Sequence, residues 1–177
     1  MLSETDSLRL RSNGDPANAK RKGPTAATQN TPRTVFADDY GFTAKDATQA
    51  LQNALDDPAA KRIVVRNMNT PWLVSKTVFL RSNKEIVFEK GAVVQAKPGT
   101  FLDNTKPMFR ALSIDNLKII GKGKGKRRAT LKMNKSEYTQ SEFGHILGID
   151  GVKNFEIRGR KLTGAGGDGI HVAGAAF

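Results

Sequence analysis

The stretch "SIDNLKIIGKG", residues 113–123, has a related copy 35 residues further on, "GIDGVKNFEIRGR", residues 148–160. Both contain an Ile-Asp pair, followed after one residue by a branched apolar residue and a Lys. A spacing of this kind is typical of chains in which each repeat stacks on the next. The sequence therefore predicts parallel strands that recur once per repeat.

Short apolar segments between residues 85 and 172 fit this period as three strands per repeat. They are 85–88, 92–96 and 109–114, then 117–120, 130–133 and 146–149, then 154–158, 161–163 and 170–172. A doubly wound α/β fold is disfavoured because it needs a helix after nearly every strand. A β-sandwich stays open as an alternative, since Asp-Gly turns occur at 150–151 and 168–169.

The region before the repeats predicts a polar tail and one helix. Residues 1–34 are rich in polar residues and Pro without any period, which predicts a disordered basic tail. Asp46 with Gln49 has the form of an N-cap and its partner, and Pro58 would end the helix. Small and apolar residues then fall on one face of a helix over 46–57, namely Ala47, Ala50, Leu51, Ala54 and Leu55.

Three stretches together resemble the right-handed parallel β-helix proteins of the pectate-lyase superfamily. They are "YGFTAKDATQALQNAL" (40–55), "IVVRNMNTPWLVSKTVFLRSNKEIVFEKGAVVQA" (63–96) and "GGDGIHV" (166–172). The resemblance implies an all-β fold, a right-handed parallel β-helix (solenoid) over residues 60–172 of a 35–177 domain. It also implies that Asp39–Gly41 and the 46–57 helix cap the first coil, and that the chain is the N-terminal portion of a longer, truncated helix.

The composition of the chain favours some classes of binding partner and excludes some kinds of site. The chain has 29 Lys and Arg against 17 Asp and Glu, a formal charge of +12, and most of it lies after residue 34. This charge favours polyanionic partners. There is no Cys, so a Cys-based zinc site and disulfides are excluded. No apolar run is long enough to span a membrane, and no secretory signal is present in the sequence as given.

Two glycine-rich motifs look like nucleotide loops but lack the required context. The G-x-G-x-x-G pattern at Gly164, Gly166 and Gly169 does not open a helix, and "GKGKGKRR" (121–128) has no Ser or Thr after its Lys. We expect the first to form a tight corner. The second predicts a basic turn suited to phosphate, sulfate or uronate groups.

The repeat register predicts where a site would form. Loops 97–108, 134–145 and 164–169 would leave the same corner of successive repeats and line one side of the fold. Acids and a His around a groove are what glycan cleavage requires. The predicted catalytic residues are Glu142, His145 and Asp168, and the predicted substrate-binding residues are Lys97, Lys106, Lys135, Tyr138 and His171. No metal ligand set or cofactor motif is predicted, and Ca²⁺ has no motif to support it.

These observations lead to two functional hypotheses. The first, which rests on the resemblance, is a lyase or glycoside hydrolase that acts on acidic polysaccharides and is inactive without further coils. The alternative is a non-catalytic module that binds acidic glycans, or a structural β-helix. Nucleic acid is disfavoured because no aromatic residue interleaves the basic turn. We expect no membrane partner, and self-association through an uncapped last coil. The resemblance suggests a secreted or periplasmic protein, but the sequence leaves localisation open.

Overall fold

The computed structural model describes residues 33–102, 106–138 and 144–174. Residues 1–32 of the predicted tail lie outside this range. Arg33 and Thr34, the last two residues of that predicted tail, belong to the first strand, β1 (Arg33–Phe36).

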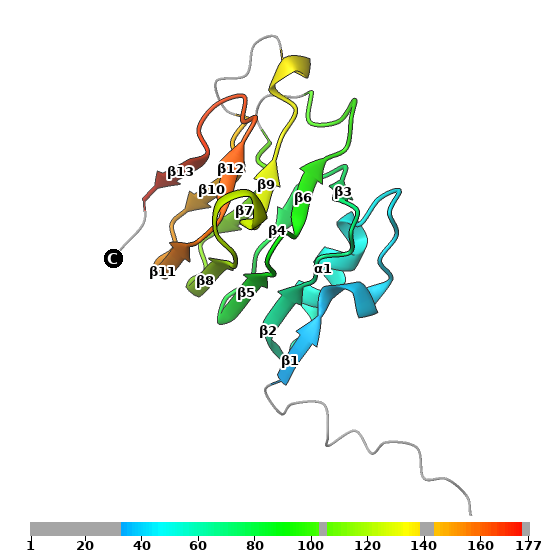
Figure 1. Ribbon diagram of the computed structural model, residues 1–177. Helices are drawn as coiled ribbons and strands as arrows, with labels where there is room; N and C mark the ends of the chain where they lie inside the picture. The colour runs from blue at the N-terminus through cyan, green and yellow to red at the C-terminus, as the bar shows by residue number, and fades with distance from the viewer. Residues whose placement is uncertain (1–32, 103–105, 139–143, 175–177) are drawn as a thin grey trace, which may run out of the picture.

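The described strands form three sheets in which every pairing is parallel (Figure 1). Sheet A contains β1, β2 (Ala60–Val65), β5 (Lys84–Phe88), β8 (Asp115–Gly121) and β11 (Lys153–Arg158), in that order. Sheet B contains β3 (Trp72–Val74), β6 (Val93–Ala96), β9 (Thr130–Lys132) and β12 (Lys161–Thr163). Sheet C contains β4 (Val78–Phe79), β7 (Phe109–Leu112), β10 (Leu147–Asp150) and β13 (Ile170–Ala173). From β2 onward the chain visits the three sheets in rotation, so each sheet pairs strands from successive repeats.

Alternation along the strands of sheet A decides which residues enter the core. Ile63, Ile86 and Ile119 are aligned across three neighbouring strands and are buried in the main core. Because successive side chains of a strand point to opposite faces, the residues that follow them lie on the outer face. These are Val64, Val87 and Ile120, which form a small separate cluster.

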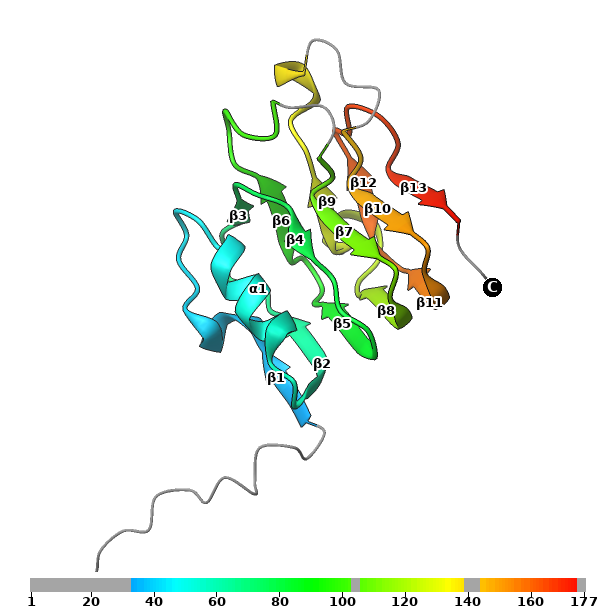
Figure 2. The same ribbon diagram turned by 180° about the vertical axis from the view of Figure 1, so that it is seen from behind.

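The single α-helix among the described residues, α1 (Thr48–Asp56), packs beside β2 and β4 (Figure 2). Its apolar stripe, predicted from the sequence, is buried in the same core as the strands. The helix begins two residues later than predicted. Asp46 Oδ1 accepts from the N–H and hydroxyl of Thr48, at 3.0 and 2.6 Å, rather than from Gln49. No described helix is long and apolar enough to cross a bilayer.

The N-terminal elements are tied to the end of α1 by a partly buried carboxylate. A short 3₁₀ turn, η2 (Ala37–Tyr40), precedes Gly41, which has a left-handed backbone. Asp57 accepts from the Tyr40 hydroxyl at 2.5 Å and from Arg33 at 2.6 Å. Burial raises the pKa of Asp57, but the hydrogen bonds from Tyr40, Arg33 and the Ala59 N–H outweigh it and hold the pKa at about 2.

The predicted fold class, an all-β right-handed parallel β-helix (solenoid), is wrong as stated. The described residues form three parallel sheets and one α-helix, a mixed α/β-like arrangement and not a clear all-β solenoid. The physical reason is that Ala50, Leu51, Ala54 and Leu55 of α1 fill part of the same core as the strands. The sequence period indicated which strands pair in parallel. It could not decide how the three sheets and the helix assemble.

Candidate functional site

The loops that were predicted to line one side of the fold do connect sheet B to sheet C. Loop 97–108 contacts loop 134–145, where the Gly99 N–H donates to Glu137 Oε2 at 2.9 Å. Loop 134–145 in turn contacts loop 164–169, where the N–H groups of Gly166 and Gly167 donate to the Gly144 carbonyl at 3.1 and 3.3 Å. These contacts join successive loops, so the residues just before β10 and β13 meet.

Three of the predicted site residues come together at this meeting point: His145, Asp168 and His171. The two imidazole rings stack with centroids 4.6 Å apart and planes 7° from parallel. Asp168 Oδ2 lies 4.0 Å from His145 Nδ1 and 3.8 Å from His171 Nδ1. His145 is buried, whereas the Asp168 side chain is 67% exposed. Burial, followed by the neighbouring His171, lowers the pKa of His145, which favours its neutral form.

A metal ion is a poor fit for this cluster as it stands. One potential ligand atom from each residue lies within 4.8 Å of the others. However, His145 Nδ1 already accepts the Asp168 N–H at 3.0 Å, so the ring proton of the neutral imidazole is on Nε2. The lone pairs of parallel stacked rings also point along parallel planes and do not converge. Metal binding would therefore require His145 to release Asp168 and the rings to turn.

The other predicted residues that the structure describes do not join the cluster. Lys97 Nζ lies 4.0 Å from Asp46 Oδ2, near the start of α1. Lys106 lines a separate cavity of about 570 Å³ with Phe79, Phe101 and Arg110 among its walls. Lys135 is in the short turn η4 (Lys135–Glu137), and the Tyr138 hydroxyl, whose pKa is raised by burial, accepts the Asn134 N–H at 3.3 Å. Glu142 lies outside the described residues.

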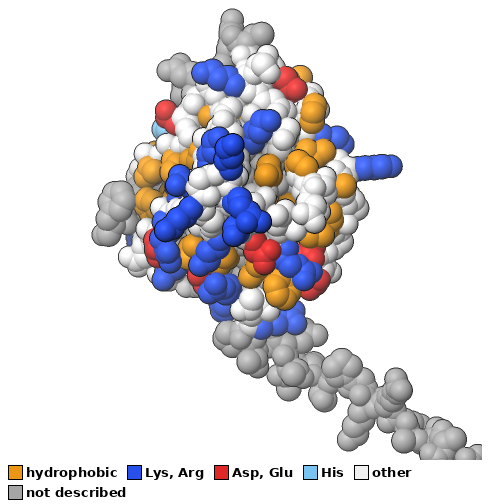
Figure 3. Space-filling view, viewed as in Figure 1, with side chains coloured by type: hydrophobic (Ala, Val, Ile, Leu, Met, Phe, Trp, Pro, Cys, Tyr) orange, Lys and Arg blue, Asp and Glu red, His pale blue; other side chains and the backbone are white. Residues whose placement is uncertain are grey.

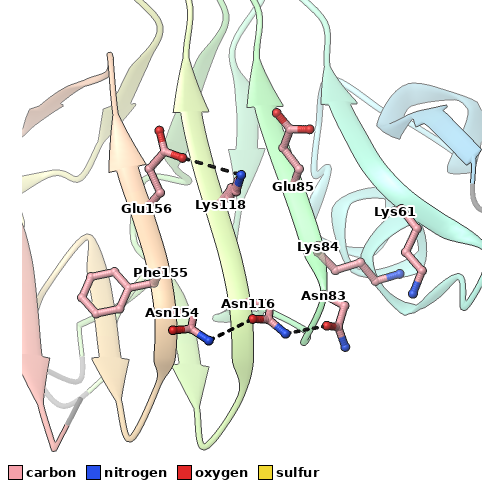
Figure 4. Close-up of a pocket in the computed structure, with 9 residues that line it drawn as sticks. All are labelled: Lys61, Asn83, Lys84, Glu85, Asn116, Lys118, Asn154, Phe155 and Glu156. Atoms are coloured by element: carbon pink, nitrogen blue, oxygen red, sulfur yellow. Dashed lines mark hydrogen bonds and ion pairs between the residues drawn. The ribbon is translucent and has the colours of Figure 1, made fainter. Parts of the chain in front are cut away.

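A groove of about 540 Å³, lined mainly by residues with polar side chains, lies on the strands of sheet A, away from the predicted cluster (Figure 4). Three asparagines follow one another along its floor, one per repeat. Asn116 Nδ2 donates to Asn83 Oδ1 at 2.8 Å, and Asn154 Nδ2 donates to Asn116 Oδ1 at 3.2 Å. All three are exposed and have left-handed backbones, with φ of 59°, 56° and 54° in chain order.

The charged residues in this groove are held by their own partners. Glu85 accepts from Arg62 at 3.1 Å, and Lys118 Nζ lies 3.9 Å from Glu156 Oε2. Lys84 is buried and donates to the carbonyls of Asp57 (2.6 Å) and Ala60, and burial lowers its pKa. Of the lining residues, only Lys61 carries a charge without an ion-pair partner or hydrogen bond among the described residues.

A cationic ridge lies where the chain passes from sheet A to sheet B. We define it by Lys90, Lys122, Lys124, Lys126, Arg127, Arg128, Arg158, Arg160 and Lys161. Figure 3 shows Lys and Arg side chains gathered over the middle of this face. Within the described part of the chain, Arg158 alone among them is in an ion pair, with Glu156.

Close backbone contacts hold the turns of the ridge together. The Lys122 N–H donates to the Phe88 carbonyl at 2.9 Å, and the Lys161 N–H donates to the Ala129 carbonyl at 2.7 Å. Gly121 and Gly159 lie so close that a Cβ on Gly159 would sit 2.1 Å from the Gly121 carbonyl oxygen. Neighbouring strands are about 4.8 Å apart, so the ridge presents cations at about this interval across the layers.

Only part of these surfaces was predicted from the sequence. The basic turn at 121–128 was predicted, but the neighbouring cations that complete the ridge were not. The asparagine row was not predicted either, although a signal was present: an Asn stands near the start of three of the five sheet A strands, at 83, 116 and 154.

Comparisons with family models, curated proteins and solved structures found no match to this chain. The resemblance to the pectate-lyase superfamily therefore stays a prediction.

Proposed function

We propose that the protein binds acidic polysaccharides along the cationic ridge. The observation that carries this proposal is the concentration of nine cations at one corner, eight of them exposed and Arg160 half-buried, with a single ion pair to a described acid. Lys and Arg that face water without partners attract a polyanion at little desolvation cost, and their potentials add over the patch.

The layout of the ridge suits a chain of carboxylated or sulfated sugars. The cations come from the turns after β5, β8 and β11 and from the strand residues Arg158 and Lys161 that border the last turn, and these turns lie in successive layers of the sheets. A polymer laid across these layers meets new positive charge at about the spacing between strands. No aromatic side chain belongs to the ridge, so a single-stranded nucleic acid would find no stacking surface there.

The test is a binding titration of the full chain with polygalacturonate, repeated at increasing salt. The key variant carries Lys124→Ser, Lys126→Ser and Arg127→Ser, all at exposed positions of the ridge. We expect the unchanged chain to bind with an affinity that falls steeply as salt increases. The variant should bind on the order of tenfold more weakly, and its affinity should depend less on salt. Neutral dextran should not bind to the ridge.

The matched control removes the same charge elsewhere, with Lys45→Ser, Lys76→Ser and Lys153→Ser, which are also exposed and without ion pairs among the described residues. Equal losses of affinity for polygalacturonate in the two variants would show that binding depends on net charge alone, and the ridge would then not be a specific site. Tighter binding to double-stranded DNA than to polygalacturonate would favour nucleic acid instead. New unsaturated or reducing ends in the same samples would test the cleavage predicted for Glu142, His145 and Asp168.

A further inference from the structure

The groove on sheet A differs from the ridge in its charge balance. Glu85 is in an ion pair with Arg62, Glu156 is in ion pairs with Lys118 and Arg158, and Lys84 is held by two backbone carbonyls. Eight of the nine lining residues have polar side chains, although most of the lining surface is apolar, and the net charge that a ligand would meet comes mainly from Lys61. Such a surface selects for hydrogen bonding rather than for charge.

The asparagine row leaves hydrogen-bonding capacity open to solvent. A primary amide has two N–H donors and a carbonyl oxygen that accepts two hydrogen bonds. The row uses one donor each from Asn116 and Asn154 and one acceptor position each on Asn83 and Asn116. The remaining donors and acceptors of the three exposed amides have no partner among the described residues.

We propose that this groove is a second, separate site that binds uncharged sugar units of an oligosaccharide. A planar amide that both donates and accepts matches two adjacent hydroxyl groups of a sugar. The row repeats this pattern at about the 4.8 Å spacing of neighbouring strands. The volume of the groove lies within the usual range for small-ligand sites.

The site is fixed before a ligand arrives. Each asparagine is held by a left-handed backbone and by its neighbour in the row. A preorganised set of amides spends little free energy on ordering when it binds. The groove meets the ridge at the ion pair between Glu156 and Arg158, but the ridge variant changes neither of these residues, so the two sites can be tested apart.

The test is calorimetric titration of the full chain with cellotetraose, xylotetraose and galactotetraose. Working in about 1 M NaCl, where the Debye length is about 3 Å, suppresses binding at the ridge. The variant Asn116→Gly removes the central amide and keeps a residue suited to φ of 56°. Asn69→Gly is the matched control, because Asn69 is exposed, has φ of 57° and lies outside the groove.

We expect saturable binding of at least one tetrasaccharide, at least about tenfold weaker in Asn116→Gly and unchanged in Asn69→Gly and in the ridge variant. Circular dichroism of each variant verifies that it is folded. No binding of any of the three sugars at millimolar concentration would overturn the proposal, as would equal binding by Asn116→Gly. Either failure leaves the salt-dependent binding of polygalacturonate untouched.

Discussion

The contact between Gly121 and Gly159 predicts a large and specific effect of adding one methyl group. Gly159 has φ of 78°, and a Cβ there would meet the Gly121 carbonyl oxygen at 2.1 Å. Gly125 offers a control in the same ridge, with φ of 55° and nothing within 4 Å of its Cβ position. Gly159→Ala therefore combines backbone strain with a collision, whereas Gly125→Ala introduces backbone strain alone.

The magnitudes follow from these two terms. An Ala with a left-handed backbone lowers the free energy of unfolding by about 1–2 kcal/mol relative to Gly. This loss is partly offset because Ala has less conformational freedom than Gly in the unfolded chain. Forcing extra volume into a packed contact adds about 1–3 kcal/mol. We expect Gly125→Ala to lower the free energy of unfolding by about 1 kcal/mol and Gly159→Ala by about 2–4 kcal/mol. For a domain of this size each kcal/mol lowers Tm by roughly 4 °C.

The assay is urea unfolding followed by circular dichroism, with Gly121→Ala as a third variant. A Cβ on Gly121 would lie 2.7 Å from the Gly159 carbonyl oxygen, and no positive φ is involved, so this variant measures the collision without the strain. If Gly159→Ala and Gly125→Ala lower stability equally, within about 0.5 kcal/mol, the close approach of the two turns is not present in solution. Loss of polygalacturonate affinity in Gly159→Ala would further connect this contact with the position of the ridge.

Three further predictions concern stability. The pKa of His145 is lowered in the folded state, so we expect the free energy of unfolding to fall as pH drops below about 6.5, the value for an unfolded His, until the pH is below the lowered pKa. His145→Asn, whose Oδ1 can accept the Asp168 N–H in place of Nδ1, should weaken that dependence in urea titrations at several pH values; an unchanged slope would contradict it. Tyr40→Phe removes the 2.5 Å hydrogen bond to Asp57 and should cost about 1 kcal/mol at neutral pH, with the difference shrinking as Asp57 protonates toward pH 2; a constant difference would argue against the bond. Leu131→Ala empties a fully buried position in the middle of sheet B and should cost about 2–5 kcal/mol in thermal unfolding, and a loss below 1 kcal/mol would show that this part of the core is not packed in solution.

Local patterns in the sequence determined the positions of most strands and of the helix. The segments expected at 85–88, 117–120 and 154–158 each fall in a strand of sheet A, and the apolar stripe from Ala50 to Leu55 is buried as predicted. Such features depend on residues within one strand or one helical turn, which a periodic pattern records directly. The period also indicated which loops would meet, and so brought His145, Asp168 and His171 into one hypothesis.

Tertiary structure alone decided the fold class and the surfaces on which function is proposed. The helix shares the core with three sheets because its stripe covers buried strand residues, and nothing in the repeat specifies that contact. The asparagine row joins residues 33 and 38 positions apart, and the ridge joins turns from three repeats. Both exist because parallel pairing sets like positions of neighbouring strands about 4.8 Å apart, a distance that depends on register between segments and not on any segment by itself.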